Sequence, residues 1–455
     1  MNAPGPPGLP WVGNLFAFRR DVLQLLVDGR RRYGDVVRYR LGPRIVHLVC
    51  HPDHVRQVLV TQQHCYDKET PSSARIRGIC GESLLTGNGD FWMRQRRLIQ
   101  PVFQPQAMAA YHDEMVRATA DLLGRWQTLA AAGRPIDVAS EMMRLTFTII
   151  GRALFGADVG GDVEAVERAA TTVLAHTYRR LEHVVPLPLW LPTPGNIRFR
   201  RALAVLDRLV LRIVAEQQRA KDQQAGPAFD LVSRLSQLRD DATDAGMTNR
   251  QLRNETITLL LAGHETTANA LTWTWHLLGK HPEAASRLRA ELQEVLADRP
   301  PTFDELPKLR YTRQVIQEAM RLYPPIWIME RRVREDDEIG GFRIPAGTTV
   351  AVSPYVTHRH PDFWNEPERF DPERFTPEEV ARRPPLAYFP FGAGGRLCIG
   401  NHFALMEAQI IVAMLGRHFR LDPVADVPIV PQPRITLRSK HGLPMTLHSL
   451  RSELS

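Results

Sequence analysis

The chain has 455 residues, of which 44% are hydrophobic, and this is enough to fill the core of one large globular domain. Its net charge is +8, but no basic run interleaved with aromatic residues indicates nucleic-acid binding. The cysteines Cys50, Cys65, Cys80 and Cys398 are too scattered for a disulfide framework and favour a reducing cytoplasm. We find neither a signal peptide nor an apolar stretch of about 18 residues, so we expect no export and no membrane anchor.

The predicted elements begin with an extended segment over residues 1–10, whose prolines and glycines do not nucleate a helix. A β-hairpin follows, with alternating strands at 36–40 and 45–49 divided by Gly42 and Pro43. These strands predict a small β region near the start of the chain.

A helix-rich body is predicted from residue 106 to residue 279, because apolar residues recur there at spacings of three and four. The clearest helical stretches are 115–129, 138–155, 200–218 and 252–278. The breaks have the length of loops rather than domain linkers, and they lie at 186–194, 221–226 and 240–246. We therefore expect one domain over residues 1–455.

The composition changes after Leu322. Pro324 and Pro325 end a helix, and residues 348–352 have the pattern of a strand. The stretch 358–391 is rich in proline, arginine and phenylalanine and has little helical periodicity. A long irregular segment inside a compact domain is usually functional.

Residues 389–400 form a glycine-rich segment that contains Cys398 and leads into a predicted helix over 401–415. Its glycines allow the backbone to approach a flat ligand closely. A cysteine just before a helix start is favoured as a thiolate, because unpaired N–H groups lie near it. Cys398 is therefore a candidate for a bound anionic sulfur, and the alternative is a buried free cysteine in a tight turn.

A second candidate site is the run Ala262–Thr267 on the long predicted helix. Gly263 weakens a helix interior by about 1 kcal/mol relative to Ala, which suggests that a neighbour or a ligand lies close to the backbone. Thr266 is placed to donate a hydrogen bond to the carbonyl of Ala262, and such bonds often bend a helix. The alternative is an ordinary amphipathic helix whose threonines face solvent.

Glu318 and Arg321 form an i, i+3 pair, which on most helices is only a surface ion pair. The histidines His264, His358 and His360 have no third ligand at supporting spacing, so we expect structural histidines rather than a zinc site.

These motifs together resemble the cytochrome P-450 superfamily. Phe391, Gly394, Arg396, Cys398 and Gly400 match every fixed position of its heme-binding signature F-x-x-G-x-R-x-C-x-G. The run Ala262–Thr267 is similar to its oxygen-binding helix segment, with Glu265 as an accepted variant of Asp, and the matches continue in family order from Trp92 to Gly400. The resemblance implies a mainly α fold with a small β region, a triangular prism that holds heme between the long central helix and the helix after the cysteine loop.

The resemblance also assigns roles to residues. Cys398 would be the axial ligand of the heme iron, and a thiolate there favours O–O cleavage. Glu265 and Thr266 would deliver protons during that cleavage. The other implied heme contacts, which include propionate-binding arginines, are Arg396, Phe391, Gly392, Gly400, Trp92, Arg96, Ala262 and Arg331, with Arg332 as an alternative to Arg331. Glu318, Arg321 and Arg374 would form a structural lock behind the heme.

The implied activity is that of a monooxygenase that contains heme b, consumes dioxygen and inserts one oxygen atom into an apolar small molecule. Because few residues follow Cys398, we expect no fused reductase, and electrons from NAD(P)H would arrive through a reductase and a ferredoxin or flavodoxin.

The alternatives are a heme-thiolate peroxygenase or isomerase, and a non-catalytic heme-binding sensor or carrier. Glu265 and Thr266 disfavour both, because neither alternative needs assisted dioxygen cleavage. A monomer in the cytoplasm is expected.

The substrate is predicted from apolar loop stretches at 71–85 and 173–190, which favour a terpene-like or other hydrophobic natural product, then a fatty acid. Arg75 and Arg77 leave a carboxylate substrate open. Candidate pocket residues are Ile326, Trp327, Ile328, Leu84 and Leu85.

The arginines of the cluster 94–97 are either part of a positive face for an acidic electron donor or a solvated helix face.

Overall fold

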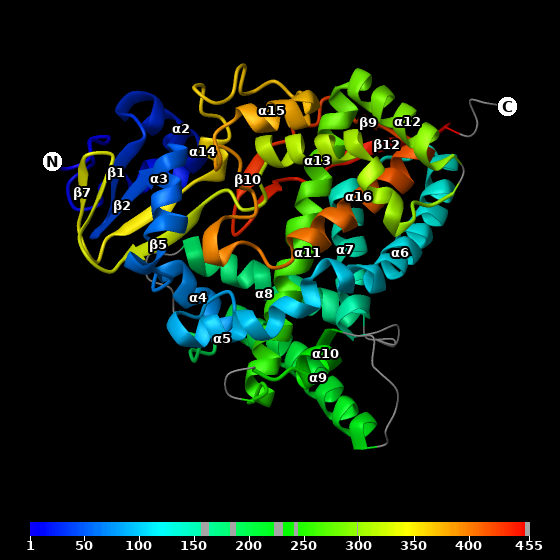
Figure 1. Cartoon of the computed structure of the whole chain (residues 1–455), viewed down its shortest axis with the longest axis horizontal. Coiled ribbons are helices and arrows are strands. Elements are labelled where there is room, and N and C mark those ends of the chain that lie inside the picture. The colour runs from blue at the N-terminus through cyan, green and yellow to red at the C-terminus, as the bar shows by residue number, and fades with distance from the viewer. Residues whose placement is uncertain (156–162, 183–187, 223–230, 241–243, 298, 451–455) are drawn as a thin grey trace.

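The computed structural model describes residues 1–155, 163–182, 188–222, 231–240, 244–297 and 299–450. Most of the helices gather on one side of the molecule, and the largest sheet lies on the other side, near the N-terminus (Figure 1). The longest helix, α11 (Asn249–Lys280), runs through the middle of the helical part (Figure 1).

The helices before α11 lie partly beside the largest sheet and partly in the helical part of the molecule (Figure 1). They are α1 (Leu15–Arg20), α2 (Val22–Tyr33), α3 (Pro52–Arg56), α4 (Pro71–Cys80), α5 (Gly89–Ile99), α6 (Pro105–Ala131), α7 (Val138–Phe155), α8 (Val163–Glu182), α9 (Pro194–Asp222) and α10 (Leu231–Gln237). The helices after α11 are α12 (Pro282–Leu296), α13 (Arg310–Leu322), α14 (Pro354–Thr357), α15 (Pro377–Arg382) and α16 (Asn401–His418).

The largest sheet has the strand order β1-β2-β8-β5-β3, in which only the pair β2–β8 is parallel. Its strands are β1 (Val36–Leu41), β2 (Arg44–Val49), β3 (Tyr66–Asp67), β5 (Met329–Val333) and β8 (Thr349–Val352). The smaller sheets contain β4 (Ile136–Asp137), β6 (Asp337–Ile339), β7 (Phe342–Ile344), β9 (Phe419–Pro423), β10 (Pro431–Pro433), β11 (Leu437–Ser439) and β12 (Pro444–Ser449). Gly42 has φ +64° in the β1–β2 turn, which explains why the hairpin closes at this glycine.

Helix α11 begins with a capping box, in which the Thr248 hydroxyl accepts from the Gln251 N–H and the Gln251 side chain accepts from the Thr248 N–H. Between Leu252 and Leu278 nearly every side chain is buried on all sides, as in a helix at the centre of a large core. The residues in this span that are not buried are Arg253, Ala262, Gly263 and Thr266.

Most predicted elements are confirmed. The hairpin is β1–β2, and the four strongest helical stretches lie within α6, α7, α9 and α11. The strand at 348–352 is β8, the helix that ends before Pro324 is α13, and the helix after Cys398 is α16.

Residues 71–80, in a stretch that the sequence analysis treated as a loop, are helical, and that prediction was wrong; the other such stretch, 173–190, is helical up to residue 182, in agreement with the predicted helix-rich body. In the first, Thr70 accepts a hydrogen bond from the Ser73 N–H and Pro71 occupies the first helical turn, so that α4 begins within 71–85. In the second, α8 extends to Glu182, and its buried Val166, Ala169, Ala170 and Val173 repeat at helical spacing. Residues 183–187 lie outside the described part of the chain.

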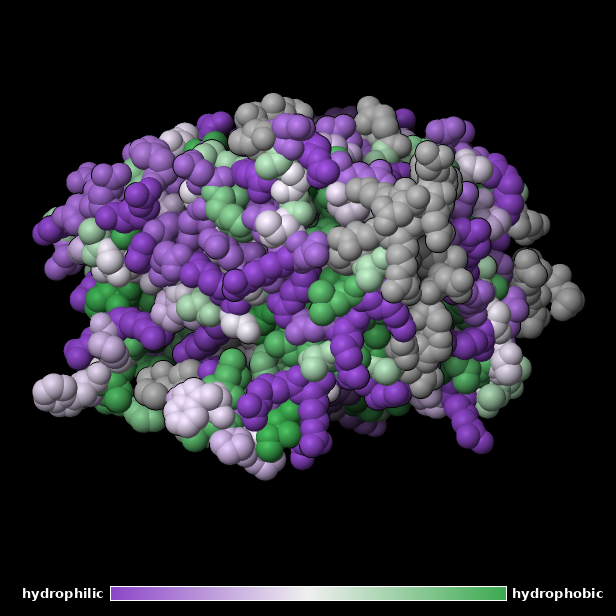
Figure 2. Space-filling view, turned by 90° about the horizontal axis from the view of Figure 1, so that it is seen from below, coloured by the Kyte–Doolittle hydropathy of each residue, from purple (hydrophilic) through white to green (hydrophobic). Residues whose placement is uncertain are grey.

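The face seen from below is mainly hydrophilic, with apolar side chains in separate small patches (Figure 2). Among the described residues, no helix combines the length and apolar character that crossing a bilayer requires.

Candidate active site

The cysteine loop, residues 389–400, is a tight turn that brings its own ends together. The Cys398 N–H donates to the Phe391 carbonyl at 2.9 Å. Gly392 and Gly394 have φ +75° and φ +66°, a region that L side chains rarely adopt. A Cβ at Gly394 would stand 2.0 Å from the Leu59 carbonyl oxygen, so this position requires glycine because of a protein neighbour. Gly400 is the N-cap of α16.

The loop is fixed from three directions. The Phe389 N–H donates to His358 Nε2 at 2.9 Å, and the Gly395 N–H donates to Gln63 Oε1 at 3.2 Å. The Arg96 guanidinium, on α5, donates to the Leu397 carbonyl at 2.6 Å. These bonds hold the backbone on both sides of Cys398.

The Cys398 side chain is exposed, although its loop is packed among other segments. Phe391 and Ile399 pack against the main core on either side of it. Desolvation raises the pKa of the Cys398 thiol, and the Gly400 N–H and the Arg96 charge oppose that shift. Both opposing groups favour a thiolate, which is the form that binds a metal.

The uncovered part of α11 is the stretch Ala262, Gly263 and Thr266. Thr266 Oγ1 donates to the Ala262 carbonyl at 2.7 Å, as the sequence predicted. The described neighbour of Gly263 is Ile150 on α7, because a Cβ at Gly263 would stand 3.0 Å from that side chain. The close approach that the sequence analysis inferred at this glycine is therefore accounted for by helix packing.

Glu265 is buried and accepts a hydrogen bond from Thr436 Oγ1 at 2.7 Å. Asn269 Nδ2 in turn donates to Thr436 Oγ1 at 3.0 Å, one turn further along α11. Burial raises the pKa of Glu265, while Thr436 and the charges of Arg438 and Arg434 lower it. Sequence reasoning missed Thr436 and Asn269, because Thr436 comes from a loop 171 residues away from Glu265.

Three cations converge next to the cysteine loop: Lys68, Arg331 and Arg396. Desolvation lowers the pKa of Arg331 and of Arg396 to about 10 each, and for Arg396 the Arg331 charge adds to the effect. Desolvation, then the charges of Arg331 and Arg396, hold the pKa of Lys68 well below its usual range. Within the described ranges, none of the three forms an ion pair with a carboxylate. Three neighbouring cations without a carboxylate between them indicate a site for an anionic group.

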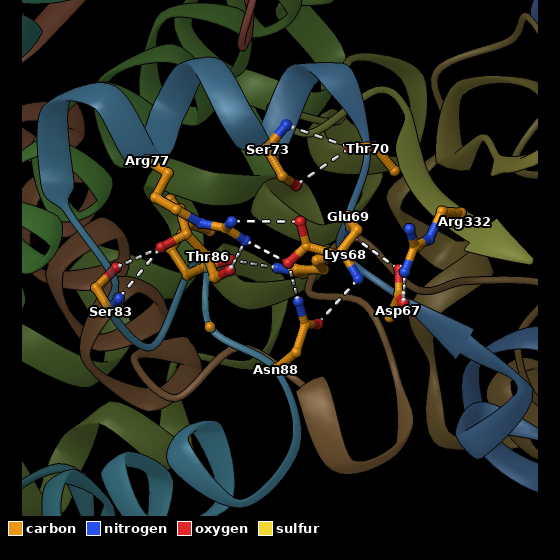
Figure 3. Close-up of polar contacts among 12 residues, drawn as sticks. Asp67, Lys68, Glu69, Thr70, Ser73, Arg77, Ser83, Thr86, Asn88 and Arg332 are labelled. Atoms are coloured by element: carbon orange, nitrogen blue, oxygen red, sulfur yellow. Dashed lines mark hydrogen bonds and ion pairs between the residues drawn. The ribbon is translucent and has the colours of Figure 1, made fainter. Parts of the chain in front are cut away.

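The polar contacts around Lys68 hold this cluster in place (Figure 3). The Lys68 N–H and Arg396 Nη2 both donate to Asn88 Oδ1, at 3.0 Å and 3.1 Å. Asn88 Nδ2 donates to Glu69, which also binds Arg77 (Figure 3). Lys68 was missed by the sequence analysis, because its only signal is a single charge after the short strand β3.

Two neighbouring arginines on β5 have different surroundings. Arg332 makes a two-pronged ion pair with Asp67, at 3.1 Å and 2.6 Å (Figure 3), and its side chain is 43% exposed. Arg331 is only 8% exposed, and its Nη1 donates to the Glu330 carbonyl at 2.9 Å. The guanidinium of Arg396 lies 4.3 Å from the centre of the Trp92 ring, and its buried Nη1 has no hydrogen-bond partner among the described residues.

These residues fit a heme. An exposed cysteine sulfur, an uncovered stretch of α11, and a dry cation cluster with an unpartnered guanidinium nitrogen are the groups that would meet iron, porphyrin plane and propionates.

Glu318, Arg321 and Arg374 come together as the sequence predicted, but in the interior rather than on the surface. Glu318 and Arg321 have 0% exposed side chains and bind each other through both carboxylate oxygens, at 2.6 Å and 2.8 Å. Arg374 Nε lies 3.6 Å from Glu318 Oε1. Arg321 also donates to three carbonyl oxygens, those of His358, Pro367 and Arg369. The lock reaches the cysteine loop because His358 also binds Phe389.

The candidate pocket residues differ in their surroundings. Trp327 lies in a core cluster and its Nε1 donates to the Arg434 carbonyl at 2.8 Å, so it packs the interior. Ile326 and Ile328 are half-buried, Leu84 packs against the main core, and Leu85 is exposed.

The segment that carries Leu84 is tied to α11. The Leu84 N–H donates to both carboxyl oxygens of Glu255, at 2.9 Å and 3.0 Å. Asn254 Nδ2 donates to the Glu82 carbonyl at 3.0 Å. Glu255 is completely buried, and burial raises its pKa to about 8. Sequence reasoning missed this anchor.

The remaining charged candidates have partners. Arg77 binds Glu69 and the Thr86 carbonyl, while Arg75 is half-buried near Arg44 and Arg180. Arg94 donates to the carbonyls of residues 245 and 246, and Arg97 pairs with Asp240. The latter two thus bind the segment before α11.

Each histidine that the sequence singled out has a protein partner. His264 contacts the Leu260 carbonyl, and His358 contacts the Phe389 N–H. His360 contacts Asp35 at 2.9 Å.

The chain is similar to known proteins over almost its whole length. Residues 3–444 match the family model described as cytochrome P-450. Two relatives from Streptomyces melanosporofaciens are cyclooctatin synthase, 39% identical over 95% of this chain and 92% of the relative, and cyclooctat-9-en-7-ol 5-monooxygenase, 36% identical over 92% and 89%. Pentalenene oxygenase of Streptomyces avermitilis is 35% identical over 93% of this chain and 92% of the relative. The solved structure of the cytochrome P450DA heme domain superimposes with a TM-score of 0.89 at 26% identity, over 100% of this chain and 99% of that one.

The chain belongs to the cytochrome P-450 family. It is a heme-dependent monooxygenase that uses dioxygen and receives electrons from a redox partner.

Proposed function

We propose that this enzyme inserts one oxygen atom into a terpene-like hydrophobic natural product, with a fatty acid as the next candidate. The proposal is supported by the names of its relatives, among them pentalenene oxygenase and two enzymes named for cyclooctatin and cyclooctat-9-en-7-ol. It is also supported by Arg77, whose engagement with Glu69 makes this arginine a poor partner for a substrate carboxylate.

We further propose the following roles. Cys398 binds the heme iron, and Phe391, Gly392, Gly400 and Ala262 surround the porphyrin. Arg396, Arg96, Arg331 and Lys68 hold the propionates, with Trp92 stacked on Arg396. The single observation that carries these roles is the cluster of three cations, because none of them forms an ion pair with a carboxylate of the described chain. When bound, heme supplies the iron at which dioxygen is activated by two electrons.

The side chains of the protein would deliver protons and hold the reacting groups in position. The hydrogen bond from Thr266 Oγ1 to the Ala262 carbonyl fixes the Thr266 side chain against α11. The methyl group and the hydroxyl of Thr266 therefore lie at the uncovered stretch of this helix. Glu265 is the acid close to this stretch, and burial raises its pKa and so favours its neutral form. Thr436, which is oriented by Asn269, lowers the pKa of Glu265 and so opposes the effect of burial. Glu265 can therefore release a proton as well as bind one.

A heme-thiolate peroxygenase or isomerase is the second candidate function, and a heme-binding sensor or carrier is the third. The buried acid–alcohol arrangement of Glu265 and Thr436 favours the monooxygenase, because the others need no proton store beside dioxygen.

We propose a monomeric, single-domain protein over residues 1–455 that takes electrons from a ferredoxin or flavodoxin and its reductase. A cytoplasmic location is supported by the four cysteines, all of which are free thiols. Arg94 and Arg97 are poor candidates for donor docking, since both bind the segment before α11.

The test is the difference spectrum of the dithionite-reduced protein with carbon monoxide, for wild type and Cys398→Ser. We expect the far-red-shifted Soret band of a thiolate-ligated ferrous carbonyl in the wild type and its loss in the variant. A wild-type band like that of a histidine-ligated heme would overturn the assignment of Cys398. Spin-state titration with sesquiterpene and diterpene hydrocarbons, against a fatty acid of equal carbon number, then tests the substrate class.

A further inference from the structure

A second group of metal-ligand side chains lies outside the heme site. His64, Cys65 and Glu335 each offer one ligand atom, and these three atoms all lie within 4.8 Å of one another. His64 and Glu335 are exposed, and Cys65 is half-buried. An ion could therefore reach the group from solvent without any movement of the core.

The backbone holds the three residues in place although 270 positions separate His64 from Arg334, the neighbour of Glu335. β3 pairs with β5 at Tyr66 and Val333. Just beyond that pair, the Arg334 N–H donates to the Cys65 carbonyl at 2.9 Å, and Arg334 Nη1 donates to the His64 carbonyl at 3.2 Å. The ligands are thus carried by two segments that the sheet edge fixes against each other, which reduces the ordering cost of binding an ion.

The ligand types select the kind of metal. A thiolate, an imidazole and one carboxylate form a borderline-soft set that suits Zn²⁺, whereas Ca²⁺ and Mg²⁺ require mostly oxygen ligands. Zn²⁺ binds such atoms at about 2.0–2.3 Å, so the three side chains need only small rotations to close around one ion. Glu335 supplies a negative charge that favours a divalent cation, and the Arg334 guanidinium is held back on the His64 carbonyl.

We propose that His64, Cys65 and Glu335 bind one Zn²⁺ ion, with water in the fourth position. The Cys65 thiol gives up its proton to solvent as the sulfur–zinc bond forms, and no electron is transferred.

The site adjoins the support of the cysteine loop. Gln63, which precedes His64, accepts the hydrogen bond from the Gly395 N–H, and a Cβ at Gly395 would meet both Gln63 and Trp92. Zinc would tie this supporting segment to the end of β5. Because the ion binds the folded state alone, we expect zinc to raise the melting temperature of the holoenzyme.

The test is a zinc titration of the heme-loaded, chelator-treated protein in competition with a chromogenic zinc indicator. We expect one equivalent bound with a dissociation constant on the order of micromolar or tighter. His64→Ala, Cys65→Ser and Glu335→Gln should each weaken binding by roughly tenfold or more. Cadmium should give an ultraviolet sulfur-to-metal charge-transfer band that Cys65→Ser lacks.

The control variants are His441→Ala and Glu378→Gln, which remove an exposed histidine and an exposed glutamate elsewhere. Both should bind zinc like the wild type, and every variant is used only if it retains the wild-type carbon monoxide spectrum. Absence of stoichiometric zinc binding, or equal affinity in the three ligand variants and the wild type, would overturn the proposal. Neither result bears on the heme site, because that spectrum is recorded independently.

Discussion

The Thr436 hydroxyl donates a hydrogen bond to the Glu265 carboxylate at 2.7 Å, across 171 positions of the chain. Asn269 donates to the same hydroxyl oxygen and so leaves the Thr436 proton for Glu265. Because a hydrogen bond to the charged form of an acid lowers its pKa, Thr436 opposes the effect of burial on Glu265.

Thr436→Val should therefore raise the pKa of Glu265 further and make the acid slower to release its proton. We expect product formed per NAD(P)H consumed to fall by roughly tenfold. The pH at which coupling reaches half of its maximum should move upward, because more base is then needed to ionise Glu265. Product, peroxide and NAD(P)H consumption measured across pH would check this.

The matched control is Thr272→Val, one of the buried threonines on α11, whose hydroxyl donates only to the Ala268 carbonyl. It should leave the pH dependence of coupling unchanged. If both variants shift the pH dependence of coupling equally, the shift results from altered helix packing, and the proposed role of Thr436 is refuted.

Arg331 and Arg332 provide a direct comparison on one strand. Arg331→Leu should speed heme loss by about tenfold or more, because it removes a dry cation from the propionate site. Arg332→Leu removes an exposed ion pair with Asp67 and should change stability by less than about 1 kcal/mol. The rate of heme transfer to an apo-globin distinguishes the two variants. If only Arg332→Leu loses heme faster than the wild type, Arg332 and not Arg331 is the propionate contact.

Lys68→Met should have opposite effects on the apoprotein and the holoenzyme. Without heme, the substitution relieves repulsion by Arg331 and Arg396, so the apoprotein should melt at the same or a higher temperature. With heme, it removes a partner of the propionates, so heme affinity should fall by roughly tenfold. Lys68→Arg should retain most of the affinity. A loss of stability in both forms would mean that Lys68 only packs the loop that carries Leu85.

Arg321→Lys tests the buried lock. Lysine cannot pair with both oxygens of Glu318 while it donates to three carbonyls, so we expect a loss of about 3–5 kcal/mol in unfolding free energy. Arg369→Ala, which removes an exposed pair with Glu366, should cost at most about 0.5 kcal/mol. Denaturant unfolding followed by circular dichroism measures both, and equal costs would contradict the lock.

Glu255→Gln tests the anchor of the Leu84 segment. The pKa of Glu255 is raised to about 8, so the folded state binds its proton more tightly than the unfolded chain does. This contribution is complete below the ordinary glutamate pKa and is lost as pH rises through about 8. The stability of Glu255→Gln relative to wild type should therefore increase with pH between these values, by at most about 1.4 kcal/mol per pH unit.

Unfolding curves at several pH values check this expectation. Glu294→Gln, an exposed substitution on α12, controls for the loss of one carboxylate. A difference between Glu255→Gln and wild type that stays constant with pH would show that Glu255 is ionised throughout.

Much of the fold was predictable, because the long helices and the hairpin have strong periodic patterns. The cysteine loop and the bond from Thr266 to Ala262 were predictable as well, since their geometry is local. The helical state of 71–80 was missed although Thr70 and Pro71 are typical of a helix start.

The residues that sequence reasoning missed share one property: their partners are distant in the chain. The role of Lys68 depends on the charges of Arg331 and Arg396, and the role of Thr436 depends on its hydrogen bond to Glu265. Side-chain periodicity reports which face of an element is buried, but it contains no information about which distant loop meets that face. The choice between Arg331 and Arg332 likewise depended on the position of Asp67.

Arg321 binds the irregular segment after β8 through the carbonyl oxygens of His358, Pro367 and Arg369 rather than through their side chains. Every residue type offers a carbonyl, so substitutions at 367 and 369 leave these acceptors in place. Over evolutionary time, the outer surface of this segment is therefore free to diversify, for example to suit a new electron donor, while the lock behind the cysteine loop persists.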